Sequence, residues 1–297
     1  MLRTLPFSSS LLASLCISLC GIAAAEPPGE NHPTPEVTWH TDYGVAYHTA
    51  RGQGRMMLIH FCDRHEDSTC KGLKKETLEH PSVCRRLQNY VCVELPLDAG
   101  FTIGDQQTTL LKHSSFREML GRPGIAVVDF LDRNSATYGD VVSTFPITRK
   151  LSYTPERIAV ILDLPPGTIT QRTLIYAVRI HPDRPQSTAG QLSGMLAAEA
   201  DSHSGHQARI RLQGHHQWET RFHQINAKLP PRTMAVEVCA ESWPGENLVE
   251  AAIECVRCWR LSSGHWSAVR ASHAYYGYDM KRGSNRIWYA TGILGKG

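Results

Sequence analysis

The stretch from residue 56 to residue 78 constrains the fold more than any other part of the chain. The run Met56–Phe61 predicts a short buried strand. Eight residues separate this run from Cys70, and apolar residues at helical spacing follow over 73–78. The order of strand, short loop, cysteine and helix indicates an α/β region with a cysteine near the start of a helix.

The first 25 residues have the features of an export signal. Arg3 gives a positive start, Leu11–Ala25 is almost purely apolar, and Ala23 and Ala25 precede Glu26 with cleavage-site spacing. The run is too short to span a bilayer comfortably, which takes about 20 residues. We expect cleavage near Ala25 and an exported chain, periplasmic or secreted, without a membrane span; a retained anchor is the alternative.

Cleavage would leave 272 of the 297 residues, a length that suits two modest domains after a short tail at 26–36. The formal charge falls only from +3 to +2, so nothing indicates a nucleic-acid partner. An odd number of cysteines would remain, which leaves at least one thiol free or paired between chains. The seven are Cys62, Cys70, Cys84, Cys92, Cys239, Cys255 and Cys258.

The first domain is predicted over 37–165, where helices alternate with apolar strands. This alternation favours an α/β sandwich, and a late hairpin favours a mixed sheet. The expected helices lie at 43–50, 68–79, 83–90 and 154–162 with one more ending near Gly121, and the expected strands at 56–61, 91–95, 122–130 and 139–145.

This order resembles the thioredoxin-like superfamily. The most specific matches are Phe61 followed by Cys70-Lys71, and the run from Arg122 through Pro123 to Asp129. The resemblance implies a thioredoxin-like fold, a cis bond before Pro123, and Cys70 and Pro123 at the catalytic positions.

The residue three positions before Cys70 is Asp67, where redox-active members of that superfamily have the attacking cysteine. Thiol–disulfide exchange needs a thiolate of low pKa. A carboxylate at Asp67 would cap the helix and disfavour a nearby thiolate. We therefore expect a domain that has lost its redox activity; an unusual Cys62–Cys70 couple is the alternative.

Prolines at 165–166 and 182–185 mark a connector, placed at 166–184, in which 170–180 has strand-like character. The second domain is expected over 185–297. Its clearest helix is 248–260, with Asn247 as its cap and Gly264 as its end, and a final strand covers 285–294.

Several residues of this second domain resemble the CAP superfamily, the cysteine-rich secretory, antigen 5 and pathogenesis-related proteins. The matches are His216, Glu241, the run Trp259–His265 with Ser-Ser-Gly-His at its end, Tyr276-Gly-Tyr and Trp288-Tyr289. The resemblance implies a CAP-like α-β-α sandwich with a cleft formed by His216, Glu241 and His265. Glu246 competes with Glu241 for the glutamate position.

Two histidines and a carboxylate could hold zinc, which accepts three protein ligands and a water. The alternative is that His216 and His265 form a hydrogen-bonded pair joining two helices. His203-x-x-His206 also has a spacing compatible with a metal, although such a pair in a polar helix more often faces solvent. Cys255-x-x-Cys258 falls inside a helix, which favours a core role over a redox role.

These patterns together predict an exported two-domain protein without catalytic activity. It would bind a peptide, a glycan or an envelope component, with zinc at the CAP-like cleft as the only candidate cofactor. The alternatives are an atypical thiol–disulfide oxidoreductase that uses Cys70 and a metal-dependent hydrolase that uses the CAP-like cleft.

Overall fold

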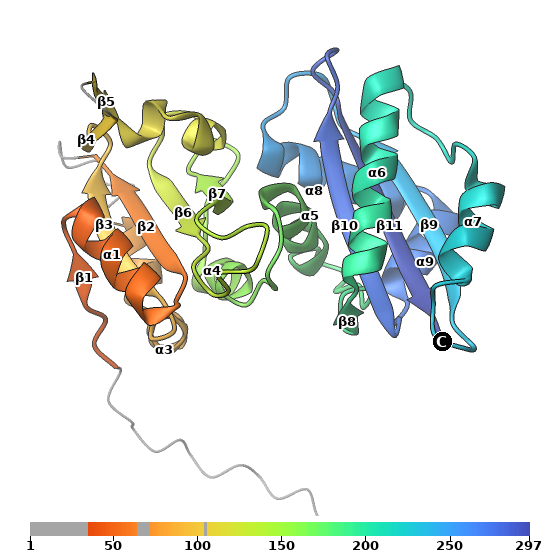
Figure 1. Ribbon diagram of the computed structural model, residues 1–297, viewed down its shortest axis with the longest axis horizontal. Helices are drawn as coiled ribbons and strands as arrows, with labels where there is room; N and C mark the ends of the chain where they lie inside the picture. Colours follow the sequence, from red (N-terminus) through yellow and green to blue (C-terminus); the bar gives the residue numbers. More distant parts are fainter. Residues whose placement is uncertain (1–34, 64–71, 104–105) are drawn as a thin grey trace, which may run out of the picture. The chain divides into compact units, whose positions relative to one another are not determined.

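The computed structural model describes residues 35–63, 72–103 and 106–297. The expected signal at 1–25 and the candidate catalytic Cys70, with Asp67, lie outside these residues. Two larger sheets and one small hairpin are present in the described part of the chain (Figure 1). None of the helices described there has the length and apolar character needed to cross a membrane.

The first sheet has five strands in the order β1-β3-β2-β6-β7. β1 and β2 pair in parallel with β3, whereas β6 is antiparallel to β2 and β7 is antiparallel to β6. The expected α/β architecture with a mixed sheet is therefore confirmed. The elements are β1 (Trp39–His40), α1 (Tyr43–Gln53), β2 (Met57–Cys62), η1 (Leu73–Leu78), α3 (Pro81–Leu87), β3 (Val91–Pro96), β4 (Gly100–Ile103), β5 (Gln106–Thr109), η2 (Leu110–Lys112), η3 (Ser114–Met119), β6 (Gly124–Val128), β7 (Val141–Pro146) and α4 (Pro155–Leu162).

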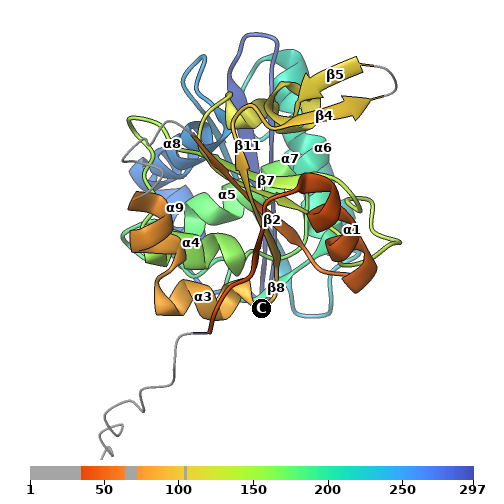
Figure 2. The same cartoon turned by 90° about the vertical axis from the view of Figure 1, so that its left-hand side faces the viewer.

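Both faces of this sheet are covered. Alternate side chains of a strand point to opposite faces, so Leu58 packs with η1, α3 and α4 while Met57 and Ile59 pack with α1 and η3. Figure 2 shows α1 on one side of β2 and α3 and α4 on the other. A strand buried on both faces reads as a continuous apolar run, which is why the sequence pattern located β2.

Two features of the first half differ from the sequence-based expectation. No cis peptide bond is present in the described ranges, so the bond before Pro123 is trans and the expected cis bond is wrong. Pro123 still lies directly before β6, and its carbonyl accepts the Ile147 N–H at 2.8 Å. The small hairpin β4–β5 follows the strand expected at 91–95, in a stretch where no strand was expected.

The second sheet has four strands in the order β8-β10-β11-β9. β8 is parallel to β10, and the other two pairings are antiparallel. The elements are α5 (Ile169–Arg179), β8 (Gln191–Leu192), α6 (Gly194–Ile210), α7 (Trp218–Asn226), β9 (Met234–Glu241), α8 (Leu248–Leu261), α9 (Ser263–Arg270), β10 (Tyr275–Arg282) and β11 (Trp288–Lys296).

Helices cover this sheet on both faces as well. Leu196 and Ala200 of α6 pack on one face with Ile293, while α5 and α8 share a core with Tyr278 and Ala290 on the other. α6 lies very close to the sheet, because a Cβ at Gly277 would be 2.2 Å from the Ala197 nitrogen. The second half is thus an arrangement of helix, sheet and helix layers.

The strand-like stretch expected at 170–180 is wrong, since these residues form the helix α5. Thr168 and Gln171 form a capping box at its start, and residues 172–178 are all buried. Two of the fully buried residues, Arg172 and Thr173, are polar, so the burial of this helix does not follow its apolar pattern. α5 contacts both β7 and β10, and a single cluster of buried apolar side chains includes residues from both sheets.

The end expected for the helix at 248–260 was also misplaced. Asn247 does cap α8, accepting from the N–H groups of Val249 and Glu250. α8 ends at Leu261, before an extended Ser262, and Gly264 lies inside the next helix, α9.

Candidate functional site

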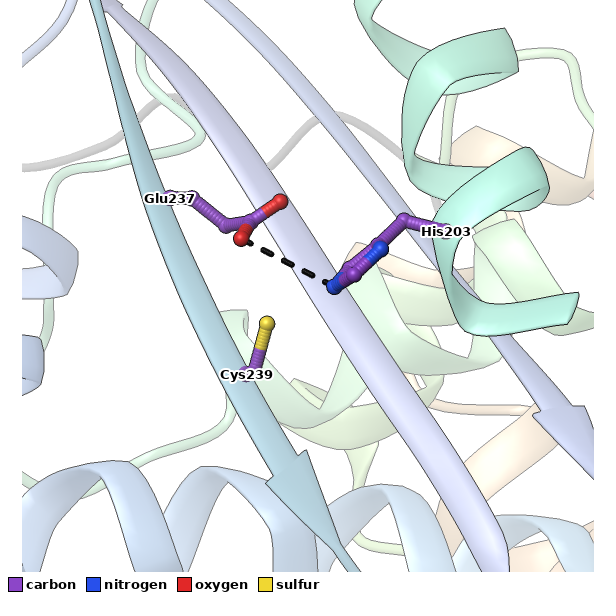
Figure 3. Close-up of side chains that lie close together, drawn as sticks. All are labelled: His203, Glu237 and Cys239. Carbon is purple, nitrogen blue, oxygen red and sulfur yellow. Dashed lines mark ion pairs between the residues drawn. The ribbon is translucent and has the colours of Figure 1, made fainter. Parts of the chain in front are cut away.

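Polar side chains gather between α6 and the edge strand β9. Figure 3 shows Glu237 and Cys239 projecting from β9 toward His203 of α6. One ligand atom from each of the three lies within 4.8 Å of the other two, and all three residues are buried. A buried group of this kind needs mutual hydrogen bonds or a bound ion to offset lost hydration.

The local sequence explains why these groups meet. Glu237 and Cys239 are two residues apart on a strand and so share a face. On α6, His203 and Gln207 are one turn apart and both are buried against the sheet. Gln207 donates to Thr291 of β11 at 2.9 Å, so the polar character of this face continues beyond the cluster.

Glu237 is the centre of the cluster, with a side chain only 1% exposed. Its Oε1 lies 3.0 Å from His215 Nδ1 and 3.7 Å from His203 Nε2, and its Oε2 lies 2.5 Å from Arg221 Nη2. Burial by itself would raise the pKa of Glu237, but the hydrogen bonds from His215 and Arg221 outweigh it and lower that pKa. Glu237 is therefore an ionised carboxylate in contact with the side chains of His203, His215 and Arg221.

His203 and Cys239 are uncharged under ordinary conditions. Burial lowers the pKa of His203 to about 4, although the charge of Glu237 opposes this shift. His203 Nε2 lies 2.9 Å from the Gly214 carbonyl, which fixes the ring. Burial, and then the charge of Glu237, raises the pKa of the Cys239 thiol well above its ordinary value.

The second pair of interest consists of His215 and His265, whose Nε2 atoms lie 3.0 Å apart. His215 Nδ1–H donates to Glu237, so in the neutral ring His215 Nε2 carries a lone pair that accepts from His265. Burial, and then the charge of His215, lowers the pKa of His265. The His215 side chain is 40% exposed, so the pair is open to solvent.

This geometry fits a divalent transition metal. Two nitrogens at about 2.0–2.1 Å from a tetrahedral zinc are about 3.3 Å apart, close to the spacing of the two Nε2 atoms. Ligating histidines commonly donate their other ring N–H to a carboxylate, as His215 does to Glu237. We call His215, His265 and Glu237 the histidine–glutamate site.

Of the three metal ligands expected from sequence, His265 lies in this site. His216 follows His215 in the chain, but its Nε2 lies 3.1 Å from the Leu212 carbonyl and its ring contacts His203 and His206. Glu241 is exposed at the end of β9, four residues and about 13 Å of strand beyond Glu237. Among the described residues, neither His216 nor Glu241 forms a hydrogen bond or a ring contact with His265.

His215, Glu237 and Cys239 were not anticipated from the sequence, and His203 was noted only for its spacing to His206. The adjacent histidines stand in the 211–217 loop, where no periodicity distinguishes one from the other. Glu237 and Glu241 share a strand face, so alternation does not separate them either. The available signal was the charge of Glu237 among the otherwise apolar residues 234–240, which marks a buried and partnered carboxylate.

Comparison with known proteins finds a relative for one part of the chain. Over 95 residues it is 33% identical to the thioredoxin-related protein DsbJ of Chlamydia pneumoniae. The match covers 32% of this chain and 26% of that relative, so the chain spans about a quarter of the relative's length. No family model and no solved structure matches the chain. The chain therefore contains a thioredoxin-like region, and the comparisons give no support for a CAP domain.

Proposed function

We propose that this is an exported binding protein in which the thioredoxin-like region has lost its redox function and a CAP-like second domain holds a divalent metal. Domain limits of 37–165 and 185–297 belong to the same proposal, with α5 of the 166–184 connector packed against both sheets. The bound partner would be a peptide, a glycan or another envelope component. The CAP-like assignment is supported by the layered second half and by the position of His265 directly after the long helix α8.

The observation that carries the metal proposal is the pair of facing Nε2 atoms backed by Glu237. Without a metal, two imidazoles at this distance have to share a single proton. With zinc, both lone pairs point at one cation and Glu237 stays as the hydrogen-bond partner of His215. The alternative set of His203, Glu237 and Cys239 is less suited, because Arg221 already neutralises Glu237 and burial keeps the Cys239 thiol protonated.

Calorimetric titration with zinc and the absorption spectrum of bound cobalt test this proposal. We expect His215→Ala and His265→Ala each to abolish tight binding, and Glu237→Gln to weaken it about 10- to 100-fold. His216→Ala is the matched control, since it removes a neighbouring imidazole outside the site. Equal loss in His216→Ala and His215→Ala, or no binding by the unmodified protein, would exclude the histidine–glutamate site.

The loss of redox function has its own test. The unmodified protein should fail to reduce insulin disulfides with dithiothreitol, because Asp67 can neither attack nor resolve a disulfide. Asp67→Cys should introduce exchange activity if the loop keeps thioredoxin geometry. Robust turnover that Cys70→Ser abolishes would instead support the thiol–disulfide oxidoreductase, in keeping with the name of the relative.

A metal-dependent hydrolase is the second candidate for the CAP-like domain. Two histidine ligands on a solvent-facing zinc leave positions at which water can bind. Zinc-dependent hydrolysis of peptide or ester substrates that disappears in His265→Ala, with the fold intact, would favour the enzyme over the binding protein.

A further inference from the structure

A separate cavity of about 880 Å³ lies near the turn between β10 and β11. No residue of the histidine–glutamate site lines it. Its volume is within the range of about 300–1,000 Å³ that is typical of small-molecule sites. The lining residues are Arg117, Glu118, Thr168, Ile169, Thr170, Leu248, Lys281, Arg282, Gly283, Ser284, Arg286 and Trp288.

Four of these lining residues are cations, and two of the four have no carboxylate partner in the part of the chain that the structure describes. Lys281 is paired with Asp201, and Arg117 lies 3.5 Å from Glu118. Within the described ranges, neither Arg282 nor Arg286 forms an ion pair with any carboxylate. These two guanidinium groups give the cavity an excess of positive charge that an anion would neutralise.

The turn that carries the two arginines is held in one conformation. Gly283 N–H donates to the Ile287 carbonyl at 2.8 Å, and Arg286 N–H donates to the Gly283 carbonyl at 3.0 Å. Asn285 adds a side-chain bond to the Tyr289 hydroxyl at 2.8 Å. A ligand would therefore meet arginines on a preformed turn, which reduces the entropy lost on binding.

The cavity has a polar and an apolar part. Thr168, Thr170 and Ser284 contribute hydroxyl groups, and Thr168 caps the start of α5, where backbone N–H groups favour anions. Ile169, Leu248 and Trp288 contribute apolar surface. The Arg282 guanidinium lies 5.9 Å from the centre of the Trp288 ring, which leaves its edge able to donate to an oxyanion.

We propose that this cavity binds an organic phosphate. The phosphate would accept hydrogen bonds from Arg282 and Arg286, and the organic part would lie against Ile169, Leu248 and Trp288. A phosphate monoester carries about −1.5 to −2 charges at neutral pH, which matches two uncompensated guanidinium groups better than one carboxylate does. The phosphate can belong to a soluble metabolite or to a lipid head group.

The probe is phenyl phosphate, compared with inorganic phosphate and phenol by calorimetry and by quenching of tryptophan fluorescence. Phenyl phosphate should bind most tightly, because it alone uses both parts of the cavity. The double variant Arg282→Gln/Arg286→Gln should weaken it at least tenfold, and Ser284→Glu should do the same by adding a negative charge beside the exposed turn. Arg270→Gln, an exposed arginine elsewhere, is the control and should bind normally.

Vesicles distinguish the two sources of the phosphate. Cosedimentation with phosphatidylglycerol vesicles that phenyl phosphate competes away, and that the double variant loses, identifies a lipid head group. Binding of phenyl phosphate without vesicle binding identifies a soluble ligand. The proposal is overturned if phenyl phosphate fails to bind at millimolar concentration, or if it binds the double variant and Ser284→Glu as well as it binds the unmodified protein.

Discussion

The two larger sheets bury different kinds of side chain. In the first, strand β2 presents apolar residues to both faces except at His60, and β7 adds only the uncharged Ser143 and Thr144 as fully buried polar residues. In the second, the face toward α5 and α8 is apolar, whereas the face toward α6 buries Glu237, Cys239, Asp279 and Thr291. Both sheets are covered by helices, so the difference lies in chemistry and not in architecture.

This difference indicates which kind of interaction stabilises each half. Apolar burial stabilises a sheet without requiring partners, whereas each buried polar atom requires one. The α6 face of the second sheet therefore depends on a network in which a single deletion leaves several groups unsatisfied. A network of this kind is expected at a binding site, where groups must be held in place for a ligand.

The largest expected effect is in that network. Glu237→Ala should destabilise the metal-free protein by about 3–5 kcal/mol, because it leaves the largely buried Arg221 without its carboxylate. Urea denaturation gives the free energy of unfolding. Glu241→Ala, on the same strand face but exposed, should change it by less than about 0.5 kcal/mol. Similar losses in the two variants would mean that Glu237 does not hold the network together.

The next effect tests the equivalence of the two faces of the first sheet. Leu58 and Ile59 are neighbours, both fully buried, and belong to opposite faces. Leu58→Ala and Ile59→Ala should each cost about 2–5 kcal/mol, since both leave a cavity among apolar side chains. If one variant has nearly normal stability in urea, that face is not a packed core and the contrast between the sheets is weaker than described.

The smallest effect concerns pH. The hydrogen bond from His60, together with Lys74 and against the effect of burial, lowers the pKa of Glu94 to about 2. An acid with a depressed pKa in the folded state contributes stability that is complete above its unfolded pKa of about 4.3 and is lost as the pH falls toward 2. The midpoint of urea unfolding should therefore fall more steeply below pH 4.3 in the unmodified protein than in Glu94→Gln. Glu79→Gln, at an exposed position, should follow the unmodified protein.

Much of the first half could be predicted because its patterns are local. Continuous apolar runs located β2, β3 and β6, and the amphipathic pattern over 154–162 located α4. The helix α5 was missed because its burial depends on contacts with both sheets, which no local pattern contains. The hairpin β4–β5 was missed because its two strands are only four residues long each and β5 consists of polar residues alone.

The site was predicted less well, since it depends on long-range register. The sequence indicated that histidines and a glutamate of the second half would come together, and His265 lies in the resulting site. The choice between His215 and His216 depends on how one loop turns, and the choice of Glu237 depends on its pairing with Ile293 across β11. Both the conformation of the loop and the register of the strands arise only in the folded chain, so no local sequence pattern shows them.

The buried helix α5 has a consequence for the order of events during synthesis. Arg172 donates to the Leu164 and Pro165 carbonyls at 3.0 and 2.7 Å and to the Ser143 hydroxyl at 2.8 Å, and Phe145 of β7 contacts the Tyr176 ring. The nascent first half therefore cannot complete its apolar core when residue 165 leaves the ribosome. It has to wait for about fifteen further residues, and until then β7 exposes an uncovered face that a chaperone or an aggregating neighbour can bind.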